Sequence, residues 1–164
     1  MEEPKIPASR GELAREYFYK GYNCAQAVVL AFADVLDVPE EQLMKISCSF
    51  GGGMGRLREV CGSFSGMLIV LGLVEGYSGP EKGQVKADHY RNVQLLAAEF
   101  EKRNGGLVCR ELLGLGRGKD DPVPEPRTPE YYKKRPCPEI IRAAADILDE
   151  YFETKKHRDE PVDL

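Results

Sequence analysis

Four cysteines are the residues of this chain whose type and spacing point to chemistry. They stand far apart along the sequence, at Cys24, Cys61, Cys109 and Cys137. No two cysteines are separated by only two residues, which is the close pairing that a thioredoxin-like active site or a zinc ribbon requires. Four thiolates brought together by folding would suit a zinc ion, an iron–sulfur cluster, or two dithiol pairs that open and close.

Each of these cysteines falls at or near the first turn of a predicted helix. The start of a helix offers unpaired amide groups and the positive end of the helix dipole, and both favour the thiolate form of cysteine. The cysteines also share helix faces with apolar residues, as Cys24 does with Val28 and Cys137 with Ile141, so each should point inward. We therefore expect the four sulfur atoms to form one site.

An alternative interpretation is that the cysteines only fill the core, because a buried cysteine behaves as a small hydrophobe. The recurrence at four equivalent helix positions favours a functional site instead. Cys48 precedes a glycine-rich stretch and is not at a helix start, so we expect it to have no role. Basic residues lie close in sequence to three of the cysteines, and for most of them we expect ordinary solvated charge; they are Arg56, Arg58, Arg110, Lys133, Lys134 and Arg135.

The elements that position the cysteines are predicted to be helices. Apolar periodicity, together with capping and breaking residues, predicts helices over residues 10–20, 24–36, 39–50, 61–75, 83–103, 107–113 and 136–154. We expect an all-α, single compact domain of about six to seven helices around a central apolar helix at residues 61–75. The domain is predicted to span residues 1–154, and residues 155–164 to form a frayed, charged tail.

Two stretches are predicted to be irregular. The glycines at residues 51–55 disfavour regular structure. Residues 114–135 are rich in glycine, proline and charge, and a loop of that length in a compact domain is usually functional. We expect this loop to lie over another part of the molecule.

Three small residues follow Cys61 on one helix: Gly62, Ser63 and Gly66. Glycine inside a helix costs roughly 1 kcal/mol relative to alanine, a cost that close approach of another backbone or of a cofactor usually offsets. We treat these three residues as candidate cofactor-binding positions, with plain helix–helix packing as the alternative.

Composition limits the classes of partner. Lysine and arginine number 23 against 27 aspartate and glutamate, a formal charge of -4, which is the wrong sign for binding nucleic acid or an anionic membrane surface. The longest apolar run, residues 67–74, is far shorter than the roughly 20 residues that span a bilayer, and the first residues lack the pattern of a secretory signal. We therefore expect a cytoplasmic protein, whose reduced thiols are better explained by metal binding or redox catalysis than by structural disulfides.

The cysteine-bearing segments resemble a known family. Residues 21–28 (GYNCAQAV), 61–66 (CGSFSG) and 109–114 (CRELLG), followed by Cys137, are similar to the redox-active family named for its C_GCAxxG_C_C pattern. The chain has Cys61-Gly62 where the pattern writes glycine before cysteine, and Ser63 stands in place of alanine. The resemblance implies a redox role, often in association with oxidoreductase systems.

The leading hypothesis is a redox protein in which the four cysteines act as catalytic groups or metal ligands at one site. It would work either by electron transfer through a bound metal or iron–sulfur cluster or by thiol–disulfide exchange, with a redox partner protein. The alternatives are a structural zinc module with four cysteine ligands and a non-catalytic helical binding or adaptor domain. The sequence is compatible with a monomer and with a homo-oligomer.

Overall fold

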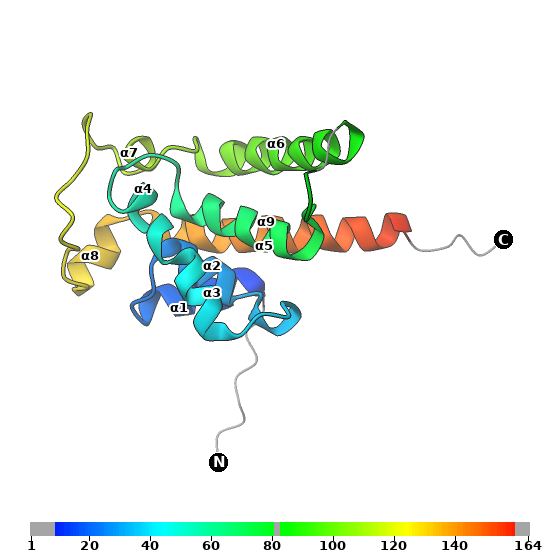
Figure 1. Ribbon diagram of the computed structural model, residues 1–164. Coiled ribbons are helices and arrows are strands. Elements are labelled where there is room, and N and C mark those ends of the chain that lie inside the picture. Colours follow the sequence, from blue (N-terminus) through cyan, green and yellow to red (C-terminus); the bar gives the residue numbers. More distant parts are fainter. Residues whose placement is uncertain (1–8, 81–82, 160–164) are drawn as a thin grey trace, which may run out of the picture.

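The computed structural model describes residues 9–80 and 83–159, and over these residues the protein is built from helices, with no strand (Figure 1). The prediction of an all-α fold is therefore confirmed. The helices run in the order α1 (Arg10–Tyr19), α2 (Cys24–Leu30), α3 (Glu40–Ser47), α4 (Gly51–Met54), α5 (Gly62–Glu75), α6 (Gln84–Asn104), α7 (Cys109–Leu112), α8 (Pro129–Lys134) and α9 (Cys137–Asp159). Two short 3-10 turns, Ala33–Val35 and Cys48–Phe50, flank α3.

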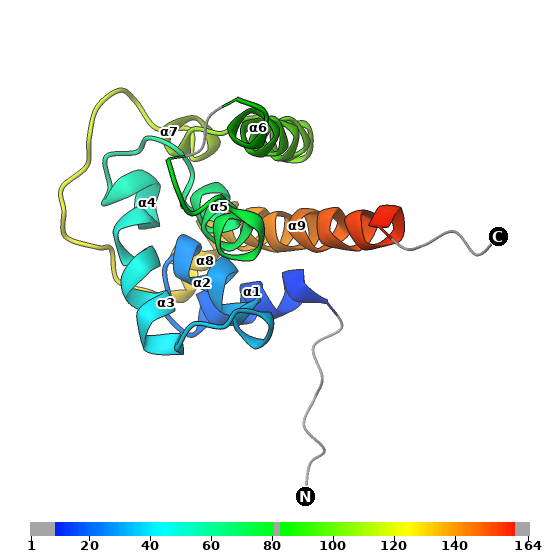
Figure 2. The ribbon, with the colours of Figure 1, turned by 45° about the vertical axis from the view of Figure 1, so that its right-hand side comes forward.

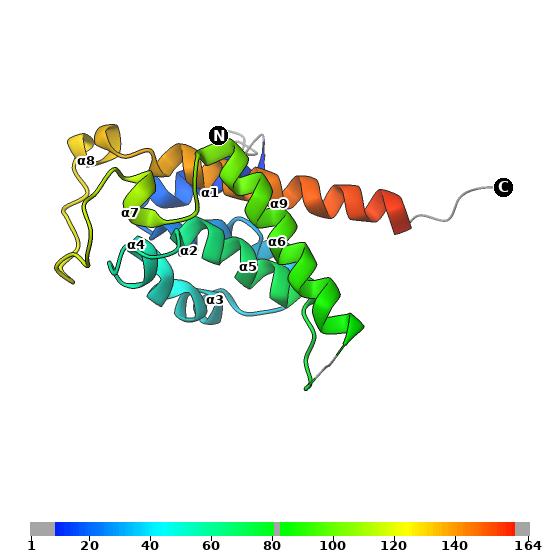
Figure 3. The same ribbon diagram turned by 90° about the horizontal axis from the view of Figure 1, so that it is seen from above.

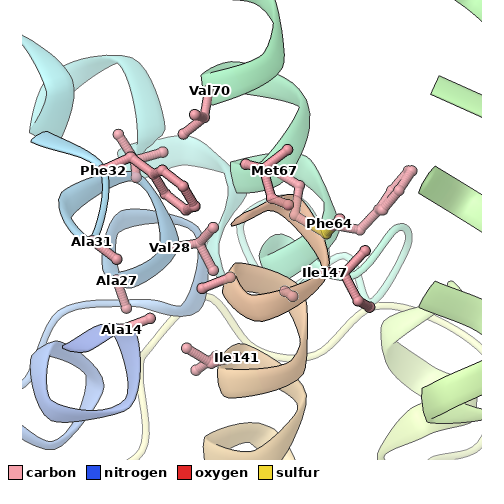
Figure 4. Close-up of a cluster of buried hydrophobic side chains, with 14 of the residues drawn as sticks. Ala14, Ala27, Val28, Ala31, Phe32, Phe64, Met67, Val70, Ile141 and Ile147 are labelled. Atoms are coloured by element: carbon pink, nitrogen blue, oxygen red, sulfur yellow. The ribbon is translucent and has the colours of Figure 1, made fainter. Parts of the chain in front are cut away.

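The core forms where α2, α5 and α9 pack together, with α1 against α9 and α2 (Figure 4). Val28 of α2, Met67 of α5 and Ile141 of α9 are each fully buried there. The long helix α6 crosses α9 and also touches α5, as the view from above shows (Figure 3). The apolar helix α5 lies at the centre as predicted, and it shares that position with α2 and α9.

The start of α2 follows from its sequence. The Asn23 side chain accepts a hydrogen bond from the amide of Gln26 (2.9 Å), and the Gln26 side chain accepts one from the amide of Asn23 (3.2 Å). This capping box satisfies two amide groups that the first turn would otherwise leave unpaired. It fixes the backbone at Cys24, the first residue of the helix.

Several element boundaries differ from those predicted. Helix α2 ends at Leu30, and the chain tightens into the 3-10 turn at Ala33–Val35, which places the Phe32 ring in the core. Helix α9 continues through Asp159, beyond the predicted boundary at residue 154, and the rest of the predicted tail, residues 160–164, lies outside the described residues.

The two stretches predicted to be irregular each contain a short helix. In α4, Gly52 and Gly53 have left-handed backbone angles (φ 68° and 69°), so this short element is kinked, which glycine permits, and its backbone is not that of a regular helix. In the long loop, Pro129–Lys134 forms α8 because Thr128 caps it by accepting a hydrogen bond from the Tyr131 amide (3.2 Å).

Over residues 9–80 and 83–159, no helix has the combination of length and apolar character that a membrane span requires.

Candidate functional site

The four predicted cysteines stand at four helix starts. Cys24, Cys109 and Cys137 are the first residues of α2, α7 and α9, and Cys61 is the residue that precedes the first turn of α5. The structure therefore confirms the helix positions expected from the sequence. The beginning of α9 lies beside α8 and on the same side of the molecule as α4 and α7 (Figures 1 and 3), and Figure 2 shows α4 and α7 to the left of α5.

All four cysteines line a single cavity of about 70 Å³, which we call the cysteine cavity. That volume is enough for a few water-sized groups. Cys61 and Cys109 are buried, and Cys24 and Cys137 are partly exposed. The remaining lining residues come from α1, the cap of α2, residues 52–58, α5, α7, the long loop with α8, and α9; they are Phe18, Asn23, Gly52, Arg58, Gly62, Ser63, Leu112, Leu113, Arg127, Tyr131, Arg135 and Ile140.

Backbone hydrogen bonds tie the segments before two of the cysteines together. The amide of Cys61 donates to the carbonyl of Leu107 (2.7 Å), and the amide of Cys109 donates to the carbonyl of Glu59 (2.6 Å). Val60 and Val108 form an isolated antiparallel bridge between these bonds. The relative position of Cys61 and Cys109 is thus held by main-chain pairing.

Glycine residues allow neighbouring segments to pack closely against the cysteine-bearing helix starts. A Cβ atom at Gly53 would lie 2.6 Å from the Cβ of Cys109, and one at Gly62 would overlap the sulfur of Cys24. A Cβ at Gly51 would lie 2.5 Å from the side chain of Asn23, the cap of α2. The glycine-rich stretch therefore packs directly against two of the cysteine-bearing helix starts.

Burial dominates the ionisation of the thiols. Loss of hydration raises the pKa of Cys61 and of Cys137 to about 12, and in each case the neighbouring Cys24 raises it further. Burial also raises the pKa of Cys24, with Cys109 adding to the effect, although the amide groups of Gly52 and Ala25 act in the opposite direction. The expectation that helix starts lower these pKa values is wrong for the three cysteines, because desolvation outweighs the amides and dipoles.

Arg58 is the buried cation of the site. Its side chain is only 4% exposed, and its guanidinium donates to the sulfur of Cys109 (3.6 Å) and to a carboxylate oxygen of Asp120 (2.7 Å). An adjacent guanidinium stabilises a sulfur anion. The expectation that the basic residues near the cysteines are solvated surface charge is therefore wrong for Arg58.

The candidate cofactor-binding residues separate into two groups. Gly62 and Ser63 line the cysteine cavity, and the buried Ser63 hydroxyl lies close enough to Cys61 to favour its thiolate form. Gly66 does not line the cavity: a Cβ there would lie 2.8 Å from the carbonyl oxygen of Ala25, so it serves the packing of α5 on α2. Cys48 is exposed and is not part of the cavity lining.

Sequence reasoning missed Arg58, Arg127, Tyr131 and Gly52 as lining residues. All four lie outside the predicted helices, in stretches where burial leaves no periodic pattern in the sequence. Tyr131, in the long loop, contacts Phe18 (ring centroids 6.4 Å apart) and also lines the cavity.

The fit of a metal ion depends on how the donor atoms are placed. Thiolates are suitable ligands for zinc or an iron–sulfur cluster. Within residues 9–80 and 83–159, however, no three histidine, cysteine, aspartate or glutamate side chains are placed together as a metal-binding group. The cysteines share a cavity without the ligand arrangement that a metal ion requires.

Comparison with known proteins agrees with the cysteine pattern. The family model described as "Putative redox-active protein (C_GCAxxG_C_C)" matches residues 22–151, a span that contains all four cavity cysteines. No curated protein and no solved structure matches the chain. Because the match covers most of the chain, the protein belongs to the C_GCAxxG_C_C family of redox-active proteins.

Proposed function

We propose that this protein is a thiol–disulfide redox protein whose four cavity cysteines act as one site. The observation that carries the proposal is that Cys24, Cys61, Cys109 and Cys137, from four separate helix starts, line one small cavity. The family description supports a redox role in general terms. A reducing compartment such as the cytoplasm, and a redox partner protein, belong to the same proposal.

The ionisation of the site supports this chemistry. A cavity that raises the pKa of Cys61 and Cys137 to about 12 disfavours several thiolates at once. A disulfide places no charge in the cavity, because two thiols lose two protons and two electrons and leave a neutral sulfur–sulfur bond. A disulfide acceptor takes up the two electrons and is released as two thiols.

The contacts support different roles for the cysteines. Cys109 is the proposed attacking thiolate, because the Arg58 guanidinium donates a hydrogen bond to its sulfur. Cys24 is the proposed resolving thiol, because it lies close enough to influence the pKa of both Cys61 and Cys137 and is itself influenced by Cys109.

A redox titration tests the proposal. The Cys48→Ser variant removes the exposed cysteine outside the cavity, and the protein is then equilibrated with mixtures of oxidised and reduced dithiothreitol. Free thiols are trapped by alkylation and counted by mass spectrometry. We expect the count to fall in steps of two, through disulfides within one chain, at a defined potential. Four thiols that stay reduced at every potential would overturn the proposal.

The second candidate is an electron carrier that holds an iron–sulfur cluster, or a structural module that holds zinc. The observation that favours it is the same cavity, in which four thiols and the Arg58 charge surround one space. A cluster would supply one-electron transfer. Because no three ligands are placed together in the described residues, binding would require the cysteine side chains to rotate.

Metal analysis separates the two candidates. Protein purified without oxygen is assayed for iron, zinc and acid-labile sulfide, and its absorption spectrum is recorded. Matched iron and sulfide that disappear in the Cys61→Ser variant would establish the cluster, and one zinc per chain whose removal unfolds the protein would establish the structural module. Colourless, metal-free protein supports thiol–disulfide exchange. If the thiols also fail to oxidise, the remaining interpretation is a helical adaptor domain.

A further inference from the structure

A second depression adjoins the cysteine cavity, and we call it the arginine vestibule. It has a volume of about 240 Å³ and is bounded by the glycine-rich stretch on one side and by the loop that includes Pro122 and Pro124 on the other. Its charged lining consists of Arg56, Arg58, Arg127, Arg135 and Glu125. Arg58, Arg127 and Arg135 also line the cysteine cavity, so the two spaces share a wall.

The charge of the vestibule is opposite to that of the whole protein. Four guanidinium groups face it, whereas the chain has a formal charge of -4. Two carboxylates partly balance them: Glu125 pairs with Arg135 (2.8 Å), and Asp120 pairs with Arg58 (2.7 Å) and lies 3.9 Å from Arg56. An excess of positive charge remains.

Arg127 is held in place by contacts that leave its charge uncancelled. Arg127 donates to the backbone carbonyls of Phe18 and Tyr22 (3.2 Å each). Tyr131 lies between two guanidinium groups, with the Arg127 carbon 5.0 Å and the Arg135 carbon 4.5 Å from its ring centroid. Such stacking positions a guanidinium while leaving N–H groups for an anion.

The backbone that carries the other two arginines is strained. Arg56 and Arg58 have left-handed φ angles of 67° and 59°, as does Met54 at 69°. Residues other than glycine adopt this conformation at a cost, and such strain concentrates at functional sites. Here the left-handed backbone carries Arg56 and Arg58, whose side chains both line the vestibule.

We infer that the arginine vestibule binds the anionic groups of a small disulfide substrate, whose disulfide bond the thiols of the cysteine cavity then reduce. This inference rests on the proposed thiol–disulfide function and names its substrate class. The volume admits a small molecule or one end of a larger one. Guanidinium groups bind carboxylates through paired hydrogen bonds, which gives both orientation and charge recognition. Arg58, which faces both spaces and donates to the sulfur of Cys109, connects recognition to the reacting thiol.

The proposed reaction requires only the substrate disulfide and the thiols of Cys109 and Cys24. The Cys109 thiolate attacks one sulfur of the substrate, forming a mixed disulfide and releasing the first substrate thiolate. Cys24 then attacks the Cys109 sulfur, which forms a Cys109–Cys24 disulfide and releases the second thiolate. The two protons from the protein thiols pass to the two released thiolates, and two electrons move from protein to substrate.

Competing disulfides of different charge test the inference. Reduced protein is mixed with oxidised glutathione, which is anionic, with bis(2-hydroxyethyl) disulfide, which is neutral, or with cystamine, which is cationic. The rate of protein oxidation is followed by trapping free thiols. We expect the anionic disulfide to react about tenfold faster than the cationic one at low salt, with the preference shrinking as salt rises.

Charge variants test which residues produce the preference. Arg135→Gln and Arg56→Gln should reduce the anionic-to-cationic rate ratio, Arg135→Lys should retain most of it, and Glu125→Gln should increase it. Arg91→Gln on α6 is the matched control, because it removes one exposed arginine outside the vestibule and should leave the ratio unchanged. Circular dichroism and thermal unfolding of each variant establish that it folds.

The outcomes distinguish the two proposals. Equal rates for the three disulfides, or a ratio that Arg91→Gln reduces as much as Arg135→Gln does, would overturn the vestibule assignment and leave the redox function standing. Failure of all three disulfides to oxidise the cavity cysteines would overturn the proposed function itself.

Discussion

Gly62 lies directly against the sulfur of Cys24, so that the start of α5 and the start of α2 meet without an intervening side chain. Gly62 follows Cys61 in sequence, and the contact therefore brings two of the four cysteine-bearing helix starts together. A Cβ at this position would also lie 2.7 Å from the backbone carbonyl oxygen of Phe50, which cannot move without shifting the glycine-rich stretch.

Gly62→Ala is predicted to destabilise the protein by about 1–3 kcal/mol, because the added methyl group overpacks the site. It should also displace the Cys24 sulfur and change its rate of alkylation. The matched control is Gly72→Ala in the same helix, where no described atom that could clash lies within 4 Å of the new Cβ. That variant should gain roughly 0.5–1 kcal/mol from improved helix propensity. Urea unfolding of both variants checks the prediction, and equal effects would contradict the close contact.

The five cysteines should react with iodoacetamide at very different rates near pH 7. Cys48 is exposed and should be modified first, whereas Cys61 is buried and its pKa is raised to about 12, so it should be among the slowest. Quenched time points analysed by peptide mass spectrometry give the order. Modification of Cys61 as fast as that of Cys48 in folded protein would show that the cavity is open to solvent.

Alkaline pH should destabilise the reduced protein through the cavity cysteines. The folded pKa of Cys61 and Cys137 is about 12, above the ordinary value of 9.0, so the folded state holds these protons more tightly than the unfolded state does. The resulting stabilisation is complete below pH 9 and is lost as the pH rises from 9 towards 12. Urea unfolding with a reductant should show a shallower decline between pH 8.5 and 10.5 for Cys61→Ala than for the unmodified protein. Identical slopes would contradict the assignment.

Arg58→Gln should cost about 1–3 kcal/mol of stability and slow the oxidation of Cys109. The substitution removes a buried guanidinium and leaves Asp120, which is 40% exposed and can be hydrated, without its partner. The control is Arg103→Gln, whose ion pairs with Glu99 and Glu150 lie on the surface and should contribute under about 1 kcal/mol. Denaturant unfolding and site-resolved thiol trapping measure the two effects. An Arg58→Gln variant as stable and as reactive as the control would remove Arg58 from the site.

The sequence predicted the helix starts well because local signals determine them. The capping pair Asn23 and Gln26 and the proline before Cys137 act within a few residues, so their effect on the chain is readable from sequence alone. The helices that start just after Cys61 and at Cys109 have no side-chain cap, so their sequence signal is the apolar periodicity.

The electrostatics of the site could not be predicted in this way. Whether Arg58 is buried depends on the pairing of residues 58–61 with residues 107–110, which is a contact between distant parts of the chain. The pKa values of the thiols depend on the same packing, so the local expectation of lowered values had the wrong sign. The role of Gly66 could not be predicted either. Its small size serves helix packing, and a sequence motif cannot separate that role from cofactor binding.

The most direct test of the account is to identify which cysteines pair when the protein is oxidised. Fully reduced protein is treated with a mild oxidant, remaining thiols are blocked, and disulfide-linked peptides are sequenced by mass spectrometry without reduction. The account predicts disulfides within one chain and only among Cys24, Cys61, Cys109 and Cys137, with Cys109 to Cys24 prominent and Cys48 blocked as a free thiol. Disulfides that involve Cys48 or join two chains, with the four cavity cysteines left as thiols, would contradict it.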